Sequence, residues 1–226
     1  MSRHATSAHS WRSDRSNHPF QHCTILQNAS PPPIAHPPTF SVSRQDVIVD
    51  FQPTPLPGCV IVQSHIFRDE RGFFLESYHA AKFREAGIDL PFVQDNHSHS
   101  KRHVVRGLHY QVNRPQGKLV RVVRGEIFDV AVDLRDGSPT RGQWFGVLLS
   151  EELMNQMYIP PGFAHGFSVL SDTADVVYKC TDLYSPQDER TILWNDSDLA
   201  IDWRLTGPPI ISPRDLQGVP FRNAPT

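Results

Sequence analysis

The sequence predicts an all-β fold, either an antiparallel sandwich or a jelly-roll barrel. Short runs of β-branched and aromatic residues recur along the chain from about residue 47 onward. Glycines, prolines and acids separate these runs at short intervals, as turns require. Only one segment shows a helical pattern. A single helix is too few for the alternating strands and helices of a parallel sheet.

The first 45 residues differ from the rest and are predicted to form a disordered tail. They hold five of the twelve histidines, two proline-rich stretches and many serines and arginines, with no apolar period. Such a segment buries too little apolar surface to offset the entropy lost on ordering. Its acid-poor composition also resembles an organellar transit peptide, although an extension without function is the hypothesis we favour.

The predicted strands begin near Val47 and combine β-branched or aromatic residues with flanking turn residues. They cover residues 47–49, 60–62, 73–75, 119–123, 127–134, 144–149, 157–159, 167–170, 176–180 and 191–194. The segment 127–134 alternates only in part, so we expect both of its faces to be partly buried.

One helix is predicted over Tyr78–Ala86, with Gly87 as its stop signal. The C-terminal stretch is rich in proline, yet apolar residues are interleaved with the prolines, namely Ile210, Ile211, Leu216 and Val219. This content predicts an ordered strap laid over the barrel. The chain is therefore divided into a tail, residues 1–45, and one domain, residues 46–226.

Composition excludes several classes of partner. The formal net charge of −2 gives no electrostatic reason to expect nucleic acid or a membrane surface. No apolar run approaches the ~18 residues of a membrane span. Cys23, Cys59 and Cys180 form no Cys-x-x-Cys pair, which favours a reducing compartment and a cytoplasmic protein.

Two histidines lie in segments predicted to enter one barrel lumen. On strand alternation, Arg106 and His109 face opposite sides of their strand. His109 shares its face with Gly107 and Gln111, which suits a polar lumen, although a lone histidine is usually structural and this pattern by itself slightly favours a structural role. His165 follows a Pro-Pro-Gly turn into a second strand, and two histidines in one lumen make a site more plausible.

A His-x-His pair, His97 and His99, suggests a metal site at first sight. Metal-binding cupin barrels use such a pair together with a downstream Glu and a further His. Here Lys101 and Arg102 follow directly and would repel a cation, and no Glu stands at the required position. We therefore predict a polar loop whose amides recognise a ligand, with no metal. The charged cluster Asp69–Glu76 is predicted to be a turn in which Gly72 leads into a strand, and a solvated loop is the alternative.

The remaining polar residues favour proton transfer and anion binding. Lys118 opens an apolar strand and either extends outward or points into the lumen. Tyr178 fits an ordinary core position with a hydrogen-bonded hydroxyl. The chain has no GxSxG, P-loop, βαβ-type GxGxxG or reactive cysteine context, so acyl transfer, phosphoryl transfer and dinucleotide chemistry lose support.

From Val47 to Gly218 the sequence resembles the dTDP-4-dehydrorhamnose 3,5-epimerases. The resemblance runs through separated motifs at residues 67–74, 93–98, 106–111, 116–121, 128–133, 159–167, 178–179, 184–186 and 192–196. It implies a cupin-like jelly-roll barrel and a homodimer that needs no metal or other cofactor. It also implies inversion of C3 and C5 of dTDP-4-dehydro-6-deoxy-D-glucose, in the synthesis of L-rhamnose.

The resemblance also implies roles for individual residues. His109 matches the family's general base and Asp215 its acidic partner, while Tyr178 matches the proton donor on the opposite face of the sugar. Lys118 matches the group beside the developing enolate oxygen. The positions implied to bind the nucleotide sugar are Arg71, Glu76, Gln94, Asp95, Asn96, Arg106, Lys118, His165, Glu189 and Arg214. The family commonly has Lys at the position of Arg214, so the contact geometry there is expected to differ.

Three other functions remain open at this point. An epimerase of a related deoxysugar pathway would invert one centre, C3 or C5. A sugar-binding cupin would bind without catalysis, which the full set of base, acid, lysine and tyrosine disfavours. A metal-dependent cupin isomerase would need the cation that the His-x-His segment is poorly suited to hold.

Overall fold

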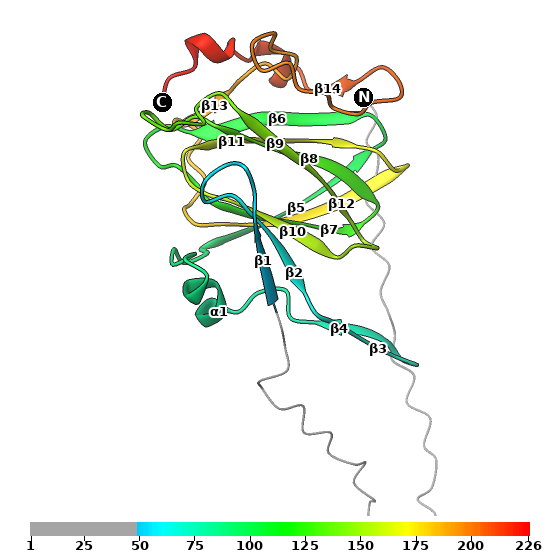
Figure 1. Cartoon of the computed structure of the whole chain (residues 1–226). Helices are drawn as coiled ribbons and strands as arrows, with labels where there is room; N and C mark the ends of the chain where they lie inside the picture. Colours follow the sequence, from blue (N-terminus) through cyan, green and yellow to red (C-terminus); the bar gives the residue numbers. More distant parts are fainter. Residues whose placement is uncertain (1–48) are drawn as a thin grey trace, which may run out of the picture. The chain divides into compact units, whose positions relative to one another are not determined.

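The computed structural model describes residues 49–226, so the predictions for the tail and for most of the first strand lie outside it. The described chain forms two β-sheets packed face to face, a lower and an upper sheet in the view of Figure 1. The strand order is β1-β2-β10-β7-β12-β5 in the lower sheet and β13-β6-β11-β8-β9 in the upper sheet. Pairing within these orders is antiparallel throughout, and β14 adds to β6 in parallel. These sheets confirm the all-β prediction.

The lower sheet contains β1 (Val49–Pro53), β2 (Val60–Ser64), β5 (Gln94–Lys101), β7 (Lys118–Arg124), β10 (Asn155–Ile159) and β12 (Thr173–Cys180). The upper sheet contains β6 (Val104–Gln111), β8 (Glu126–Asp133), β9 (Trp144–Ser150), β11 (Phe163–Val169), β13 (Glu189–Thr191) and β14 (Ile210–Ile211). A separate hairpin pairs β3 (Ile66–Asp69) with β4 (Gly72–Leu75). The helical elements are α1 (Ala80–Glu85) and two short 3-10 turns, η1 (Asp215–Gln217) and η2 (Phe221–Asn223). No helix among residues 49–226 is long and apolar enough to cross a membrane.

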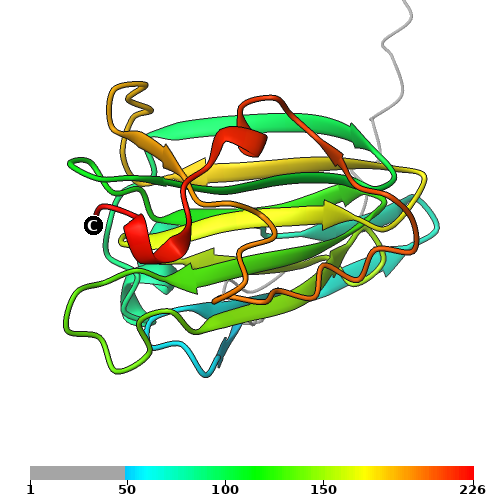
Figure 2. The same ribbon diagram turned by 90° about the horizontal axis from the view of Figure 1, so that it is seen from above.

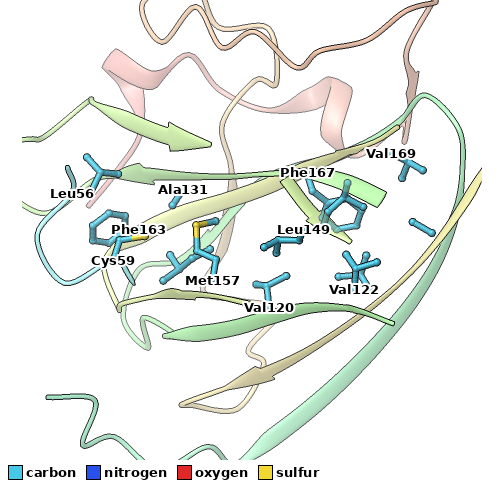
Figure 3. Close-up of a cluster of buried hydrophobic side chains, with 14 residues drawn as sticks. Leu56, Cys59, Val120, Val122, Ala131, Leu149, Met157, Phe163, Phe167 and Val169 are labelled. Carbon is cyan, nitrogen blue, oxygen red and sulfur yellow. The ribbon is translucent and has the colours of Figure 1, made fainter. Parts of the chain in front are cut away.

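The main core fills the space between the two sheets (Figure 3). The lower sheet contributes Val120, Val122 and Met157, and the upper sheet contributes Leu149 and Phe163. Burying a side chain of this kind contributes roughly 1.5–3 kcal/mol each. The core therefore fixes the spacing of the sheets, and with it the distance between functional groups on opposite walls.

The outer faces of both sheets are also covered. Residues 199–224 run across the upper sheet (Figure 2), where Leu199 and Trp203 pack on Phe128 and Val130. The inner face of the same strand carries Ile127, so both faces of β8 are buried, which explains why residues 127–134 do not alternate cleanly. Under the lower sheet, Phe83 and Ile88 from the α1 region pack on Val62, Leu119 and Tyr158.

Three local predictions need correction. The segment 94–101 is a strand, β5, and not a polar loop. Its alternating small and polar residues lack the apolar pattern of a strand, and pairing with β12 along its whole length supplies the order instead. The predicted strand at 191–194 ends at Thr191, after which Ile192 makes a single bridge to Val219. The helix spans Ala80–Glu85, shorter than predicted, and Gly87 follows it with a φ of +86°.

Asp133, at the end of β8, organises the turn that leads to β9. Its side chain is fully buried and accepts hydrogen bonds from the Arg135 guanidinium at 2.7 and 2.9 Å and from the hydroxyls of Ser138 and Thr140 at 2.6 and 2.7 Å. Burial acts to raise the pKa of this carboxyl, but these donors outweigh it and lower the pKa below its ordinary value. A carboxylate with a lowered pKa stabilises the fold at neutral pH, and that contribution is lost as the pH falls through the acid range.

We therefore expect Asp133→Asn to lower the free energy of unfolding at pH 7 by about 3–5 kcal/mol, since it leaves the Arg135 charge without its buried partner. Urea denaturation measures the difference, which should shrink at low pH where the wild-type carboxyl is also protonated. Asp136→Asn is the matched control, because the Asp136 side chain is 76% exposed. Equal unfolding midpoints for the two variants would contradict the role given to Asp133.

Candidate active site

A cavity of about 370 Å³ lies between the two sheets, where their inner faces change from apolar to polar. The lower sheet contributes side chains from β5, β7 and β12, and the upper sheet from β6, β11 and β13. The predicted site residues that line it are Gln94, Asn96, Arg106, His109, Lys118, His165, Tyr178 and Glu189. Most of the site residues that were predicted from the sequence therefore line one cavity.

His109 is paired with Asp215 at the wall of this cavity. Their Nε2 and Oδ1 atoms lie 2.7 Å apart, and Asp215 Oδ2 accepts a hydrogen bond from the Gly107 main-chain N–H at 3.3 Å. Burial acts to raise the pKa of Asp215, but the His109 and Gly107 contacts outweigh it and the pKa is lowered. The carboxylate thus stays charged and holds one imidazole nitrogen, which leaves Nδ1 as the proton-accepting atom.

A second histidine–carboxylate pair lies beside the first. His165 Nε2 and Asp129 Oδ1 are 2.7 Å apart, and both side chains are almost fully buried. Burial lowers the pKa of His165, and the nearby Asp129 opposes that shift. The sequence analysis did not assign Asp129. The sequence did contain a signal for it, because Asp129 stands within the apolar strand 127–134. A carboxylate buried in such a strand needs a partner.

Lys118 and Tyr178 occupy the lower wall of the cavity. Burial lowers the pKa of the Lys118 ammonium, although Cys180, Asp129 and Glu189 act against this shift. Burial raises the pKa of Tyr178, so its hydroxyl keeps its proton at neutral pH. Of the two orientations considered for Lys118, the structure thus has the one that points into the lumen.

Arg106 lines the same cavity as His109, which corrects the expectation that the two face opposite sides of their strand. The pairing of β6 with β11 shifts register here, so that Arg106 and His109 stand opposite Phe167 and His165. One extra residue in β6 reverses the alternation, as at a β-bulge. Gly107 permits this, since a Cβ at that position would come within 2.6 Å of the Gly166 Cα. Ser100 Oγ then accepts a hydrogen bond from Arg106 Nε at 3.0 Å.

Amide side chains line the β5 wall of the cavity. Gln94 Nε2 donates a hydrogen bond to the side-chain oxygen of Asn96, Oδ1, at 3.0 Å, and Asn96 Nδ2 donates to Cys180 Sγ at 3.5 Å. On the upper wall, Glu189 forms an ion pair with Arg214, which comes from the segment before η1. Arg214 and Asp215 line a groove of about 370 Å³ that meets the main cavity at Arg106 and His109.

Three of the predicted binding residues lie away from the cavity. Arg71 is at the tip of the β3–β4 hairpin, 85% exposed and paired with Asp69. Glu76 follows the hairpin and accepts a hydrogen bond from Lys82 at 2.8 Å. Asp95 points outward from β5 and pairs with Lys179 at 3.0 Å. Within one copy of the chain, these side chains do not meet the histidines.

The His-x-His pair also lies outside the cavity. His97 and His99 project from the outer face of β5 and share one oxygen of Asp175, at 3.0 and 3.2 Å. In the part of the chain that the structure describes, no group of three or more His, Cys, Asp or Glu side chains is arranged to hold a metal ion. The cavity itself is lined by side-chain acids and bases, among them His109, Lys118 and Tyr178, which suit abstraction and return of a proton beside a carbonyl group.

Comparison with known proteins identifies the chain's relatives. The family model described as dTDP-4-dehydrorhamnose 3,5-epimerase matches residues 53–223. A protein of that name from Pseudomonas aeruginosa is 55% identical over 170 residues, which cover 75% of this chain and 94% of the relative.

Solved structures agree with this match. The 3,5-epimerase of Legionella pneumophila in complex with dTDP-4-keto-L-rhamnose is 50% identical with a TM-score of 0.76, covering 78% of this chain and 94% of that one. A 3'-monoepimerase from Streptomyces bikiniensis in complex with dTDP-quinovose is 35% identical with a TM-score of 0.73, covering 76% and 88%. On the extent of these matches, the chain belongs to the dTDP-4-dehydrorhamnose 3,5-epimerase family of cupin-type jelly-roll proteins.

Proposed function

We propose that this chain inverts C3 and C5 of dTDP-4-dehydro-6-deoxy-D-glucose to give dTDP-4-dehydro-L-rhamnose, in the synthesis of dTDP-L-rhamnose. One observation carries the proposal. The His109–Asp215 pair opens onto the same cavity as Lys118 and Tyr178, so a base, a cation and a proton donor surround one space. The family's activity and the ligand of the Legionella pneumophila structure support the same substrate class.

His109 is the proposed base. The 4-keto group makes the hydrogens on C3 and C5 acidic enough to be removed by an adjacent imidazole. His109 Nδ1 takes the proton while the electron pair of the C–H bond moves into an enolate. Asp215 stabilises the imidazolium that results, because its carboxylate remains charged at 2.7 Å from Nε2.

Lys118 is the proposed partner of the enolate. Its ammonium lies in the same cavity, where the removal of water strengthens its attraction for the charge that develops on O4. Because burial lowers its pKa, it also gives up a proton more readily than a surface lysine does. Stabilisation of the developing charge is often the largest single contribution to catalysis of this kind.

Tyr178 is the proposed acid that completes the inversion. The proton must return to carbon on the face opposite to the base, so a second group is required. Tyr178 lies on β12 of the lower sheet, and His109 lies on β6 of the upper sheet. Its raised pKa keeps the hydroxyl protonated until the carbanion forms. Because one 4-keto group activates both carbons, the same pair of residues serves both centres.

The other cavity residues are proposed to bind the nucleotide sugar. Arg106 presents a guanidinium held from behind by Ser100, an arrangement that suits a diphosphate oxygen. Gln94, Asn96 and His165 offer neutral hydrogen-bonding groups that suit sugar hydroxyls. None of these steps needs a cofactor, and we propose that the reaction takes place in the cytoplasm.

We also propose that the working form is a homodimer. The β3–β4 hairpin carries Arg71 and exposes Phe73 and Phe74, which are 53% and 65% exposed. Exposed aromatic pairs of this kind are typical of protein interfaces. The resemblance assigns Arg71 and Glu76 to substrate binding, yet both lie outside the cavity of their own copy. A second copy that receives the hairpin beside its cavity reconciles these observations.

A single-centre epimerase is the second candidate. The similarity to the Streptomyces bikiniensis 3'-monoepimerase keeps this alternative open, because the same fold supports inversion of one carbon. The two candidates differ in how many carbons exchange their proton with solvent.

Incubation with dTDP-4-dehydro-6-deoxy-D-glucose in D₂O distinguishes the candidates. We expect deuterium at both C3 and C5 of the sugar, detected by NMR and mass spectrometry. Label at one carbon only would replace the proposed function with the single-centre alternative. No label at either carbon would support binding without catalysis.

Replacement of the base or its partner should slow turnover strongly while the fold is retained. We expect His109→Ala to lower kcat by about 10²–10⁴-fold. Asp215→Asn should also lower kcat, since an amide cannot stabilise the imidazolium. Thermal unfolding checks that both variants fold. His109→Ala with wild-type isotope exchange would overturn the assignment of the base.

Mixing two inactive variants tests whether the hairpin acts in the partner subunit. Arg71→Ala and His109→Ala should each be inactive alone. If Arg71 serves the partner's cavity, co-refolding equal amounts should restore about a quarter of wild-type activity, because half of the random dimers are mixed and each has one complete site. No recovery, with mixed dimers present by native mass spectrometry, would show that Arg71 does not act across the interface.

A further inference from the structure

The side chain of Gln111 ties the loop between β12 and β13 to the upper sheet. Gln111 is the last residue of β6 and is 6% exposed. Its Oε1 accepts a hydrogen bond from the Ser185 main-chain N–H at 2.7 Å, and its Nε2 donates to the main-chain carbonyls of Leu183 at 3.3 Å and Arg114 at 2.6 Å. The amide oxygen and nitrogen are therefore both engaged within the protein, and Gln111 is not among the residues that line the main cavity.

Gln111 supplies most of the hydrogen bonds that hold residues 183–185 to the barrel. In the described part of the chain, three bonds join the main chain of these residues to positions outside residues 182–189, and two of them end on Gln111. The third runs from the Tyr184 N–H to Gln94 Oε1 at 2.8 Å, in the lower sheet. The other main-chain bonds of this segment stay within residues 182–189. The main chain on both sides of Tyr184 is therefore held by one amide.

The two ends of the loop are held by other contacts. Gln116 Nε2 donates to the Asp182 carbonyl at 2.8 Å at one end, and Glu189 begins β13 at the other. The tip of the Tyr184 side chain is also directed, because its hydroxyl donates to Glu189 Oε2 at 2.5 Å. None of these contacts holds the main chain of residues 183–185, which spans the interval between the two ends. Its position therefore depends chiefly on Gln111.

Tyr184 is the residue through which this loop reaches the cavity. It lines the cavity and is 44% exposed, so it lies where the cavity opens to solvent. Lys118 and His165 line the same cavity but are 9% and 5% exposed. The groups proposed to meet the reacting sugar therefore lie at the buried end. A nucleotide attached to that sugar extends toward the open end, where Tyr184 stands.

We propose that Gln111 is a positioning residue for substrate binding. Its amide holds residues 183–185 so that Tyr184 already stands at the cavity opening before the nucleotide sugar arrives. A segment that is ordered in advance loses less conformational freedom on binding, which increases the affinity for the ligand. The inference rests on the proposed function, and it adds to the site a residue that acts without touching the substrate.

The variant Gln111→Met tests the inference through kinetics, because it keeps the length of the side chain and removes its three hydrogen bonds. We expect KM to rise about tenfold, since the loop must then be ordered by the substrate itself. The groups that transfer protons lie on other elements, so kcat should stay within about twofold of the wild type. A fall in kcat with an unchanged KM would overturn the proposal, because Gln111 would then act through its strand neighbour His109.

The matched control is a buried amide that bonds to the main chain elsewhere in the barrel. Asn155 on β10 is 7% exposed, and its Nδ2 donates to the Leu148 carbonyl at 2.9 Å. It is not among the residues that line the main cavity. Asn155→Leu should leave KM and kcat unchanged. A rise in KM equal to that of Gln111→Met would show that the loss of any buried amide suffices, and would overturn the specific role of Gln111.

Two measurements without turnover separate this inference from the proposed function. Isothermal titration calorimetry with dTDP should give a Kd about tenfold higher for Gln111→Met than for the wild type, and an unchanged Kd for Asn155→Leu. Hydrogen exchange of the free protein should be faster at the Ser185 amide in Gln111→Met, because that amide loses its acceptor.

The outcomes are independent of epimerisation. An equal dTDP Kd for the wild type and folded Gln111→Met would overturn the inference even if the enzyme turns over as proposed. Unchanged exchange at Ser185 would also overturn it, since the loop would then be held without Gln111. A weakened dTDP Kd together with faster exchange would support the inference even if no turnover is found.

Discussion

A hydrogen bond of 2.7 Å between His109 Nε2 and Asp215 Oδ1 connects positions 106 residues apart in the sequence. It forms only because the C-terminal segment crosses the upper sheet and packs Leu199 and Trp203 on the outer face of β8. The Asp215 carboxylate then approaches β6 beside Gly107, whose N–H it also accepts. The C-terminal strap thus provides Asp215, one of the two residues of the proposed catalytic pair. The packing of the strap on the upper sheet is what places this carboxylate beside His109.

The second constraint is the removal of charged groups from water. Lys118, Asp129 and His165 are all buried, and each isolated charge would be costly in an apolar interior. The cost is reduced by mutual placement: Asp129 pairs with His165 and also lies close enough to Lys118 to favour its charge. The same low-dielectric surroundings strengthen the attraction between Lys118 and an enolate. One barrel therefore holds an apolar core and a reactive cavity on the same strands.

The arrangement of the proposed site divides its residues into two groups. The groups that transfer protons lie on strands or on the strap of one copy, where the core fixes their positions. Arg71 lies on a projecting hairpin, and Glu76 follows it. A rigid barrel supplies the precision that proton transfer requires, while a projecting element is suited to reach a ligand or a second copy.

Much of this protein is determined by local sequence. Turn residues between β-branched runs were enough to predict the all-β fold, and a series of separated motifs along the chain was enough to identify the family. Other features were decided only by tertiary structure. The polar segment 94–101 became a strand because β12 pairs with it, and one extra residue in β6 turned Arg106 toward the same cavity as His109. The partnership of His165 with Asp129, and the ion pair between Glu189 and Arg214, also arise from strands and loops that meet in space. Periodicity reports which face of its own strand a side chain occupies, whereas these contacts depend on register and on burial between distant segments.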